Sequence, residues 1–424
     1  MTHSTEIAHT KEDSKCRVLI VNGGSFGKRI KHELEKKDIR GVHLVSTECC
    51  TQKRNTLYKT FIHAAAEVID RKQYYSDYSI KIEKRSKINW IEIRDRIKEK
   101  IAQVEMKQAP VSTCTVKEMN QKIYIDSEEC SAENIIMVNS HVSSEIGFNN
   151  IWIKLLEMES LPKRVFINGC NKHSIEAASM LSDLGSKVYL MSPGKDLMVG
   201  YDKNIQESVK SILLDKGVTL FFNSSLADKD VLNKPKIRVR MPSGIDHAVE
   251  NVDLYLYEHE HSLSKVKKGS QYVFKVAEPS KKIGAAEISL LCSMYPNVFT
   301  PEMDYKPYVP CYIYTSPPVA VIGYTEEEAI KRYTKVRTTS SKFRGLFYSV
   351  CQNKVPTDYK IIYACDIDKE INNEEKLVGL HLFGKSSIDV IKGFAIGMHC
   401  GISPEEILKT IPIHPTSSEE VITG

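Results

Sequence analysis

The 424-residue sequence contains no run of 18 apolar residues, so it offers no candidate transmembrane helix. Its first fifteen residues lack both the apolar core of a signal peptide and the arginine-rich pattern of a transit peptide, which favours a cytoplasmic protein. The 11 cysteines are an odd number and show no C-x-x-C spacing. This argues against a secreted disulfide framework and against a zinc site, and we expect no metal.

A strong charge of either sign is also missing. Lys and Arg number 59 against 54 Asp and Glu, and the net charge of +5 permits a polyanionic partner without requiring one. Hydrophobic residues make up 42% and charged residues 27%, which is typical of a globular protein rather than a disordered or fibrous one. The length exceeds what one core can fill, so we expect two or three domains.

Two segments have the pattern that opens a nucleotide-binding fold. In the first, an apolar run at 16–21 is followed by a glycine turn, a helical pattern and a second apolar run at 41–45. In the second, the run 164–171 is followed by a helical pattern at 175–185 and an apolar run at 187–191. A strand, a glycine turn, a helix and a strand begin a parallel sheet, so we predict two Rossmann-like domains.

The first glycine turn departs from the G-x-G-x-x-G pattern. Its three positions are Asn22, Gly24 and Gly27, so the glycine that makes the tight turn is absent. The acidic residue that would hold a ribose hydroxyl falls on Ser46. We therefore expect Gly24 and Gly27 to be vestigial. Asn tolerates a positive φ, so a turn that still binds a nucleotide is an open alternative.

The second glycine turn repeats this fault. Its positions are Gly169, Asn171 and Ser174, with Glu176 following on the helix. The missing middle glycine is the one that lets the backbone approach a phosphate. We expect Gly169 and Glu176 to be vestigial as well, although Lys172 offers a charge that attracts phosphate.

The order of these segments resembles the flavin-dependent pyridine nucleotide-disulfide oxidoreductases, the family of glutathione and thioredoxin reductases. The most specific similarity lies in SPPVAVIGYTEEEA (316–329) and GFAIGMHCGISPEEILKTIPIHPTSSEE (393–420), and the likeness runs from about Cys16 to the end. The resemblance implies an FAD domain, an NADPH domain and an interface domain that forms a homodimer. The predicted fold class is α/β, with two Rossmann-like nucleotide-binding-type domains plus a C-terminal α+β interface (dimerisation) domain.

The same segments give the expected domain boundaries. We expect a polar tail at 1–15, a degenerate FAD-type domain with a helical active-site segment at 16–150, a degenerate NAD(P)H-type domain at 151–260, a shortened remnant of the FAD-type domain at 261–300, and the interface domain at 301–424.

The resemblance also implies a redox pair spaced C-x4-C and a proton-transfer pair of histidine and carboxylate. Alignment places the redox pair at Cys50 and Asn55, and one thiol cannot form an intramolecular disulfide. The proton-transfer pair falls on His414 and Glu419. With one thiol and no flavin, we expect Cys50, His414 and Glu419 to be vestigial.

The flavin-side turns of the family fall on 138–139 and 258–261, where the expected glycines are absent. The G-D motif that holds the flavin ribityl chain is missing between 261 and 301, where the chain is shorter than the family requires. We therefore expect no cofactor, and FAD and NADPH only if the protein is an active enzyme.

Two stretches poor in acidic residues predict a surface for a polyanion such as RNA or the ribosome. The residues expected to make these contacts are Lys331, Arg332, Lys335, Arg337, Lys342, Arg344, Lys265, Lys267 and Lys268. Aromatic residues interleave the first stretch, a combination that suits backbone contact and base stacking. The alternative is a solvated charged face.

The function predicted from the sequence is that of a catalytically inactive pseudo-oxidoreductase. Its fold would serve as a binding or regulatory protein in the cytoplasm, docking on RNA or a large assembly such as the ribosome. Two alternatives remain open. One is an active or residual FAD/NADPH-dependent disulfide oxidoreductase, and the other is a nucleotide-sensing protein.

Overall fold

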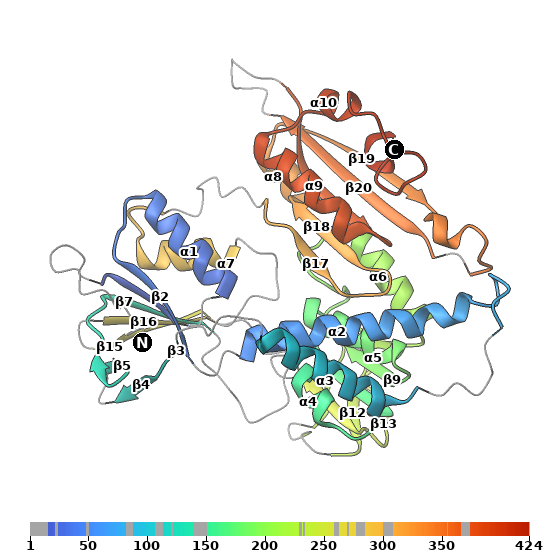
Figure 1. Cartoon of the computed structure of the whole chain (residues 1–424), viewed down its shortest axis with the longest axis horizontal. Coiled ribbons are helices and arrows are strands. Elements are labelled where there is room, and N and C mark those ends of the chain that lie inside the picture. The colour runs from blue at the N-terminus through green and yellow to red at the C-terminus, as the bar shows by residue number, and fades with distance from the viewer. Residues whose placement is uncertain are drawn as a thin grey trace. The chain divides into compact units, whose positions relative to one another are not determined.

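The structure is a computed structural model of the chain (Figure 1), which divides into two compact units. One unit comprises 1–58, 98–145 and 259–305, and the other comprises 59–97, 146–258 and 306–424. The five segments expected from the sequence divide the chain more finely than these two units, and the boundaries of those segments stay predictions. The structure describes residues 16–21, 24–47, 51–81, 88–106, 113–119, 122–138, 151–228, 231, 234–257, 263–268, 271–276, 285–299, 308–353, 355–365 and 374–423.

The first unit is built on a mostly parallel sheet in the order β15-β16-β7-β1-β2-β3. Only the β15–β16 pair is antiparallel. The strands of this sheet are β1 (Val18–Val21), β2 (Val42–Thr47), β3 (Thr113–Cys114), β7 (Asn134–Val138), β15 (Leu263–Lys268) and β16 (Gln271–Val276). A small antiparallel sheet contains β4 (Val116–Met119), β5 (Lys122–Ile125) and β6 (Glu128–Glu129).

Helices α1 (Gly24–Lys36) and α7 (Ala285–Met294) lie side by side on this sheet (Figure 1). Helix α1 forms because Phe26, Ile30 and Leu34 recur every four residues and make one apolar face. That face is buried against Val18 and Ile20 of β1. The strand–turn–helix–strand pattern predicted for this segment is confirmed by the structure.

The second unit contains another parallel sheet, in the order β10-β9-β8-β14. Its strands are β8 (Arg164–Asn168), β9 (Lys187–Met191), β10 (Thr219–Phe221) and β14 (Leu254–Tyr257). The neighbouring antiparallel sheet contains β11 (Ser225–Leu226), β12 (Ile237–Arg240) and β13 (Asp246–Val249). The helices of this part are α4 (Ile151–Glu157), α5 (Lys172–Asp183) and α6 (Lys203–Asp215). Thus the second Rossmann-like opening is also present.

Two long helices and a short 3₁₀ turn precede this second sheet in the chain. They are α2 (Thr51–Arg71), the 3₁₀ turn Lys72–Tyr74 and α3 (Trp90–Met106). The carboxyl half of α2 belongs to the second unit and buries Ile62 and Ala66, which are four residues apart on one face. This half of α2 carries residues of the candidate site.

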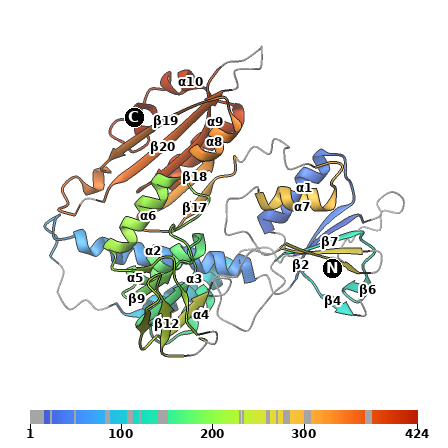
Figure 2. The same cartoon turned by 180° about the vertical axis from the view of Figure 1, so that it is seen from behind.

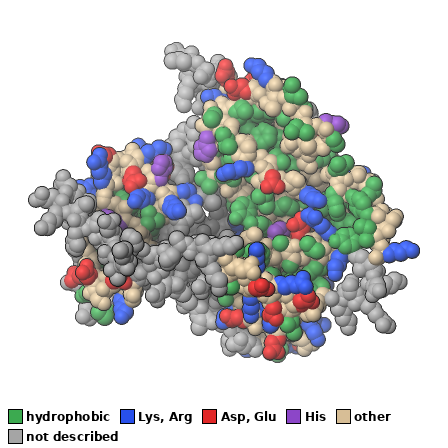
Figure 3. Space-filling view, viewed as in Figure 1, with side chains coloured by type: hydrophobic (Ala, Val, Ile, Leu, Met, Phe, Trp, Pro, Cys, Tyr) green, Lys and Arg blue, Asp and Glu red, His purple; other side chains and the backbone are tan. Residues whose placement is uncertain are grey.

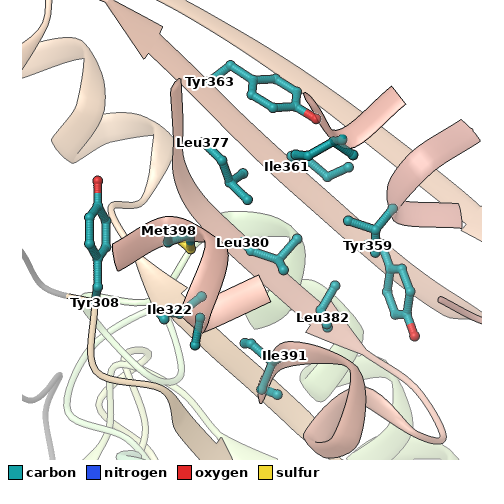
Figure 4. Packing of buried hydrophobic residues seen from close by; sticks show 14 residues of the cluster. Tyr308, Ile322, Tyr359, Ile361, Tyr363, Leu377, Leu380, Leu382, Ile391 and Met398 are labelled. Atoms are coloured by element: carbon teal, nitrogen blue, oxygen red, sulfur yellow. The ribbon is translucent and has the colours of Figure 1, made fainter. Parts of the chain in front are cut away.

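The C-terminal part of the second unit is an antiparallel sheet in the order β17-β18-β21-β20-β19, covered by α9 on β18 and β21. Its strands are β17 (Cys311–Ile313), β18 (Val319–Gly323), β19 (Lys335–Phe343), β20 (Thr357–Cys365) and β21 (Lys376–Phe383). Its helices are α8 (Glu326–Arg332), a 3₁₀ turn at Leu346–Tyr348, α9 (Ser387–Cys400), α10 (Pro404–Leu408) and α11 (Glu420–Thr423). Figure 4 shows Ile391 of α9 beside Leu382 of β21 in the core between helix and sheet.

Helix α6 packs against β20 and β21, so the second parallel sheet and the C-terminal sheet share one helix (Figure 2). A buried ionic cluster lies at this contact. Lys360 Nζ on β20 donates to Asp202 Oδ1 at 3.0 Å and to Glu326 Oε2 at 2.6 Å. Asp202 also accepts from the Asn204 backbone amide as the N-cap of α6. The predicted α/β class with a C-terminal α+β domain is confirmed.

Among the residues that the structure describes, no helix is long and apolar enough to cross a membrane.

We expect Gly323→Ala at the end of β18 to destabilise the protein by roughly 3 kcal/mol. Gly323 has a φ of +79°, and a Cβ there would lie 2.1 Å from the Val378 carbonyl oxygen, which is backbone and cannot move aside cheaply. Gly393→Ala in α9, where a Cβ meets nothing within 4 Å, is the control. It should be neutral or stabilising by up to about 1 kcal/mol. Urea unfolding followed by circular dichroism measures both, and equal midpoints would contradict the prediction.

Candidate active site

The candidate site lies at the carboxyl edge of the second parallel sheet, where α/β folds place their ligands. Strand β8 ends at Asn168, and the chain then turns through Gly169 into α5, which begins at Lys172. Gly169 has a φ of +152°, which an L side chain rarely adopts. Its amide donates to the Met191 carbonyl of β9 at 3.0 Å. Glycine is therefore required here by the backbone, and the turn places the N-terminus of α5 at the sheet edge.

Glu176, one turn into α5, is completely buried and ionised. Its Oε2 accepts a hydrogen bond from Lys59 Nζ of α2 at 3.0 Å, and its Oε1 accepts from the Tyr314 backbone amide at 3.1 Å. Burial alone raises the pKa of Glu176, but Lys59, with further help from Lys172 and His173, outweighs it and holds the pKa well below the ordinary value. A fixed negative charge thus joins α5, α2 and the C-terminal domain.

An aromatic ring lies beside the Lys59 ammonium. Lys59 is itself buried, and its Nζ lies 5.3 Å from the centroid of the Tyr314 ring. His63, one helical turn after Lys59, packs against the same ring at 4.7 Å between centroids. Burial lowers the pKa of His63, and its Nδ1 has no hydrogen-bond partner. The site therefore contains a buried neutral imidazole with one ring nitrogen that lacks a hydrogen-bond partner.

A second cation lies beside a pair of tyrosines at the same edge. Lys172 Nζ is 5.1 Å from the Tyr312 ring centroid and 3.7 Å from Cys311 Sγ. The Tyr312 and Tyr314 rings meet edge-on at 4.9 Å, and burial together with Tyr314 raises the pKa of Tyr312 to about 12. The Tyr312 phenol is therefore a neutral group at physiological pH. Two ammonium groups, one carboxylate and two aromatic rings suit a ligand with a flat ring and an anionic group.

Several of the residues predicted from the sequence fall into this site or into the first glycine turn. Gly169 and Glu176 belong to the cluster just described. Gly24 begins α1, and a Cβ on Gly27 would lie 2.9 Å from Ile20 Cγ2. Gly27 therefore holds α1 close to β1, which is the role of the third glycine in a dinucleotide-binding turn. Cys50 lies outside the described residues, as do the side chain of Asn55 and the turn at 258–261.

The predicted proton-transfer pair is assembled at the C-terminus. His414 Nδ1 lies 2.9 Å from Glu419 Oε2 and 3.2 Å from Glu419 Oε1. The Thr416 amide donates to Glu419 Oε1 at 3.3 Å and helps to fix the carboxylate. The His414 side chain is 80% exposed, whereas that of Glu419 is 16% exposed. The carboxylate thus orients an accessible imidazole, which is the arrangement that proton transfer needs.

The basic residues predicted to contact RNA are largely neutralised within the protein. Arg337 donates to Glu375 Oε2 from both Nε and Nη2 at 2.8 Å, and Lys335 lies 3.5 Å from the same carboxylate. Lys342 Nζ lies 3.6 Å from Asp358, and Arg332 lies over the Tyr324 ring. Blue and red side chains are interspersed on this unit in the face drawn in Figure 3. These cations therefore do not form one basic surface.

The other basic residues predicted to contact RNA also do not form a continuous surface among the described residues. Lys265 Nζ donates to the Ser293 carbonyl at 3.1 Å and lies over the Tyr272 ring, and Lys267 lies 5.9 Å from that ring. Lys331 and Arg344 are exposed, and the Lys268 side chain lies outside the described residues. The interleaved aromatics are not a stacking surface either, because Phe347 and Tyr348 pack on Tyr74 and Phe343 packs on Tyr359.

Lys59 and Tyr314 are functional candidates that the sequence analysis did not identify. The sequence did contain one signal for Lys59. This lysine precedes Ile62 by one helical turn and Ala66 by two, so it lies on the buried face of α2. A lysine is rarely buried without a partner. The partner itself is 117 residues away in the chain, so no local pattern indicates it.

Comparisons with known proteins agree with this geometry. Residues 164–241 match the pyridine nucleotide-disulphide oxidoreductase family, and residues 309–423 match the pyridine nucleotide-disulphide oxidoreductase dimerisation domain. The chain is 26% identical over 306 residues to a glutathione reductase of Schizosaccharomyces pombe, covering 63% of this chain and 62% of that protein. It is 23% identical over 303 residues to a glutathione reductase of Yarrowia lipolytica, with coverage of 63% and 62%. The matched part is less than two thirds of these relatives' length.

A solved structure shares the fold. A Cu(II) complex of a mutant of the HOCl-induced flavoprotein disulfide reductase RclA from Escherichia coli superposes with a TM-score of 0.61. The superposition covers 96% of this chain and 98% of that chain, at 16% sequence identity. The resemblance identified in the sequence is thereby confirmed, whereas the degeneracy of its motifs stays a prediction.

The prediction of an inactive pseudo-oxidoreductase that docks on RNA or the ribosome was wrong. The two relatives named above are glutathione reductases, and residues 164–241 match the pyridine nucleotide-disulphide oxidoreductase family, which favours the enzyme alternative. The prediction of an RNA-binding surface counted lysines and arginines along the chain. It failed because the fold pairs Arg337 and Lys342 with carboxylates.

The prediction that the protein takes no cofactor was also wrong. The matched family is defined by a pyridine nucleotide, and the fold is that of a flavoprotein disulfide reductase. Physically, too much weight was given to Asn22 and Asn171 in the two turns. Gly27 still holds the first helix against its strand, and Gly169 still turns the second strand into its helix.

We expect Lys59→Met to destabilise the protein by roughly 3 kcal/mol at neutral pH, because it leaves the Glu176 charge buried and uncompensated. The double variant Lys59→Met/Glu176→Leu should recover most of this loss, since it removes both charges. Urea unfolding measures the three free energies. A double variant no more stable than Lys59→Met would contradict the prediction.

The same pair predicts a dependence on pH. Because the folded pKa of Glu176 is below its ordinary value of 4.5, the carboxylate stabilises the fold above pH 4.5 and loses this effect as the pH falls toward the folded pKa. The free energy of unfolding of the wild type should therefore fall relative to that of the double variant as the pH is lowered below 4.5. A difference that is constant with pH would contradict this assignment.

Proposed function

Since this chain belongs to the pyridine nucleotide-disulphide oxidoreductase family through its oxidoreductase and dimerisation domains, we propose that it is an FAD- and NAD(P)H-dependent disulfide oxidoreductase. The observation that carries the proposal is the His414–Glu419 pair, with a carboxylate bound to Nδ1 of an exposed imidazole. With Nδ1 held, Nε2 is the nitrogen that exchanges a proton with a thiol or thiolate outside this domain.

The residues at the carboxyl edge of the second parallel sheet fit a pyridine nucleotide. The N-terminus of α5 and the Lys172 ammonium attract its pyrophosphate, and Gly169 provides the turn that the backbone needs. The aromatic rings of Tyr312 and Tyr314 lie at the same edge of the sheet and suit the flat ring of a nicotinamide. Glu176 holds the Lys59 ammonium in place beside the Tyr314 ring.

The first unit fits a second dinucleotide. Helix α1 begins at Gly24 directly after β1, so its N-terminus faces the carboxyl edge of the sheet, and Gly27 lets helix and strand approach closely. When bound, the nicotinamide supplies a hydride and the flavin passes electrons on to a disulfide. The residues of this chain bind and orient those groups and supply the proton at His414.

We place the dimer contact in residues 301–424, as the dimerisation domain implies. Apolar side chains beside His414 are exposed in the single chain, with Ile411 at 89% and Ile413 at 75%. Exposed apolar groups of this size are typical of an interface. A partner chain there would cover them and receive His414. The cytoplasmic location stays a prediction of the sequence.

In the purified protein reconstituted with FAD, we expect NADPH-dependent reduction of glutathione disulfide. His414→Gln should lower kcat by about a hundredfold to ten-thousandfold, because it removes the proton donor. Reduction of the bound flavin by NADPH, followed as bleaching in a stopped-flow experiment, should not change, because His414 is not part of that site.

His399→Gln is the matched control, since His399 is an exposed histidine of the same domain that lies against the Tyr308 ring. Its kcat should equal that of the wild type. A chain that binds no FAD, or a His414→Gln variant with unchanged kcat, would refute the proposed function.

For the dimer, we expect Ile413→Glu to weaken self-association by at least tenfold, because it places a charge in a contact that excludes water. Ile245→Glu in the turn between β12 and β13, where the side chain is 70% exposed, is the control and should have no effect. Sedimentation equilibrium measures both. Equal association constants for the two variants would exclude Ile413 from the contact.

A further inference from the structure

The turn that follows strand β9 borders the candidate active site. The Met198 amide in this turn donates to the Cys170 carbonyl at 2.8 Å, and Cys170 directly follows Gly169 in the turn after β8. The two turns are therefore joined at the carboxyl edge of the second parallel sheet. In a nucleotide-binding fold, the end of this second strand is where the protein distinguishes a ribose with a free 2′-hydroxyl from one with a 2′-phosphate.

The residue directly after β9, where a discriminating carboxylate would stand, is Ser192. Its side chain is buried in the turn, where the hydroxyl accepts from the Gly194 amide and donates to the Asp196 carbonyl, both at 3.3 Å. The Ser192 amide donates to the Phe221 carbonyl of β10 at 2.8 Å. Ser192 thus shapes the turn. Because its side chain is neutral, it does not repel a 2′-phosphate as a carboxylate would.

The carboxylates that follow in the chain are compensated by lysines. Asp196 Oδ2 lies 3.6 Å from Lys203 Nζ, at the start of α6. The Asp202 side chain is only 2% exposed, and its Oδ1 accepts from Lys360 Nζ at 3.0 Å. Between 192 and 203, a segment that the structure describes throughout, no carboxylate is therefore left to exclude a phosphate.

Lys195 is the remaining charged residue of this segment. It is exposed, and the segment 192–203 contains no arginine. Arginine binds a phosphate through two parallel hydrogen bonds, whereas lysine acts as a point charge on a flexible chain. Exposed ion pairs contribute little, because solvent screens them and the side chain loses freedom when it pairs. The attraction of Lys195 for a 2′-phosphate is therefore modest.

We propose that this chain accepts NADH as well as NADPH, and that Lys195 provides a small preference for the 2′-phosphate. The inference rests on the proposed function, because it concerns the pyridine nucleotide site of that proposal. It adds that the site selects neither nucleotide strictly. No carboxylate at the end of β9 excludes the phosphate, and no arginine makes the phosphate necessary for binding.

The test is isothermal titration calorimetry of the full chain reconstituted with FAD, with NAD⁺ and NADP⁺ as the probes. We expect both to bind, with a Kd for NADP⁺ that is about two- to fivefold lower. The ratio of the two Kd values should approach one as the salt concentration rises, because salt screens an exposed charge. A ratio above about tenfold in either direction would overturn the inference and leave the proposed function standing. If neither nucleotide binds, the proposed function itself fails.

Two variants of Lys195 test its assignment. Lys195→Ala should raise the Kd for NADP⁺ to that for NAD⁺ and leave the latter unchanged, whereas Lys195→Glu should make NAD⁺ the tighter ligand. Lys163→Ala is the matched control, since Lys163 is an exposed lysine directly before β8, at the amino edge of the same sheet. It should change neither Kd. If Lys195→Ala weakens both nucleotides equally, Lys195 contacts a group that they share, and its assignment to the 2′-phosphate is wrong.

Discussion

The buried ion pair of Lys59 and Glu176 is the constraint on which the second unit depends. Removing both charges from water costs several kcal/mol per ion, and the pair offsets this cost because both oxygens of the carboxylate accept hydrogen bonds. Glu176 meets the ammonium of α2 with one oxygen and the Tyr314 amide with the other. One carboxylate therefore fixes the position of three chain segments, and the tyrosine rings and His63 of the candidate active site are arranged around it.

Two other lysines of the second unit also link distant elements through ion pairs. Lys360 joins Asp202 of the α6 N-cap to Glu326 of α8, and Lys216 joins Asp70 of α2 to Asp183 of α5. Each lysine contacts acidic residues from elements far apart in the sequence, which stabilises their packing and makes the contact specific.

These clusters also explain where sequence reasoning succeeded and where it failed. The glycine turns were identified correctly as the openings of two nucleotide folds, and the interface motif led to His414 and Glu419. The inference of lost function rested on single positions such as Asn171, although the neighbouring Gly169 retains its left-handed conformation. The inference of an RNA surface rested on local charge, and Arg337 is paired with Glu375, which is 38 residues away.

By itself, the sequence determined most of the secondary elements, because apolar periodicity and turn residues act over a few neighbouring positions. The family followed from the resemblance of its motifs, above all those at 316–329 and 393–420. It also determined the His414–Glu419 pair, whose members are five residues apart. The tertiary structure alone decided the partners of Lys59, Lys216 and Arg337. With them it decided the arrangement of the candidate active site and the pairing of the basic residues that had been predicted to contact RNA. A charge is stabilised or exposed by whatever the fold places beside it, and those neighbours come from distant parts of the chain.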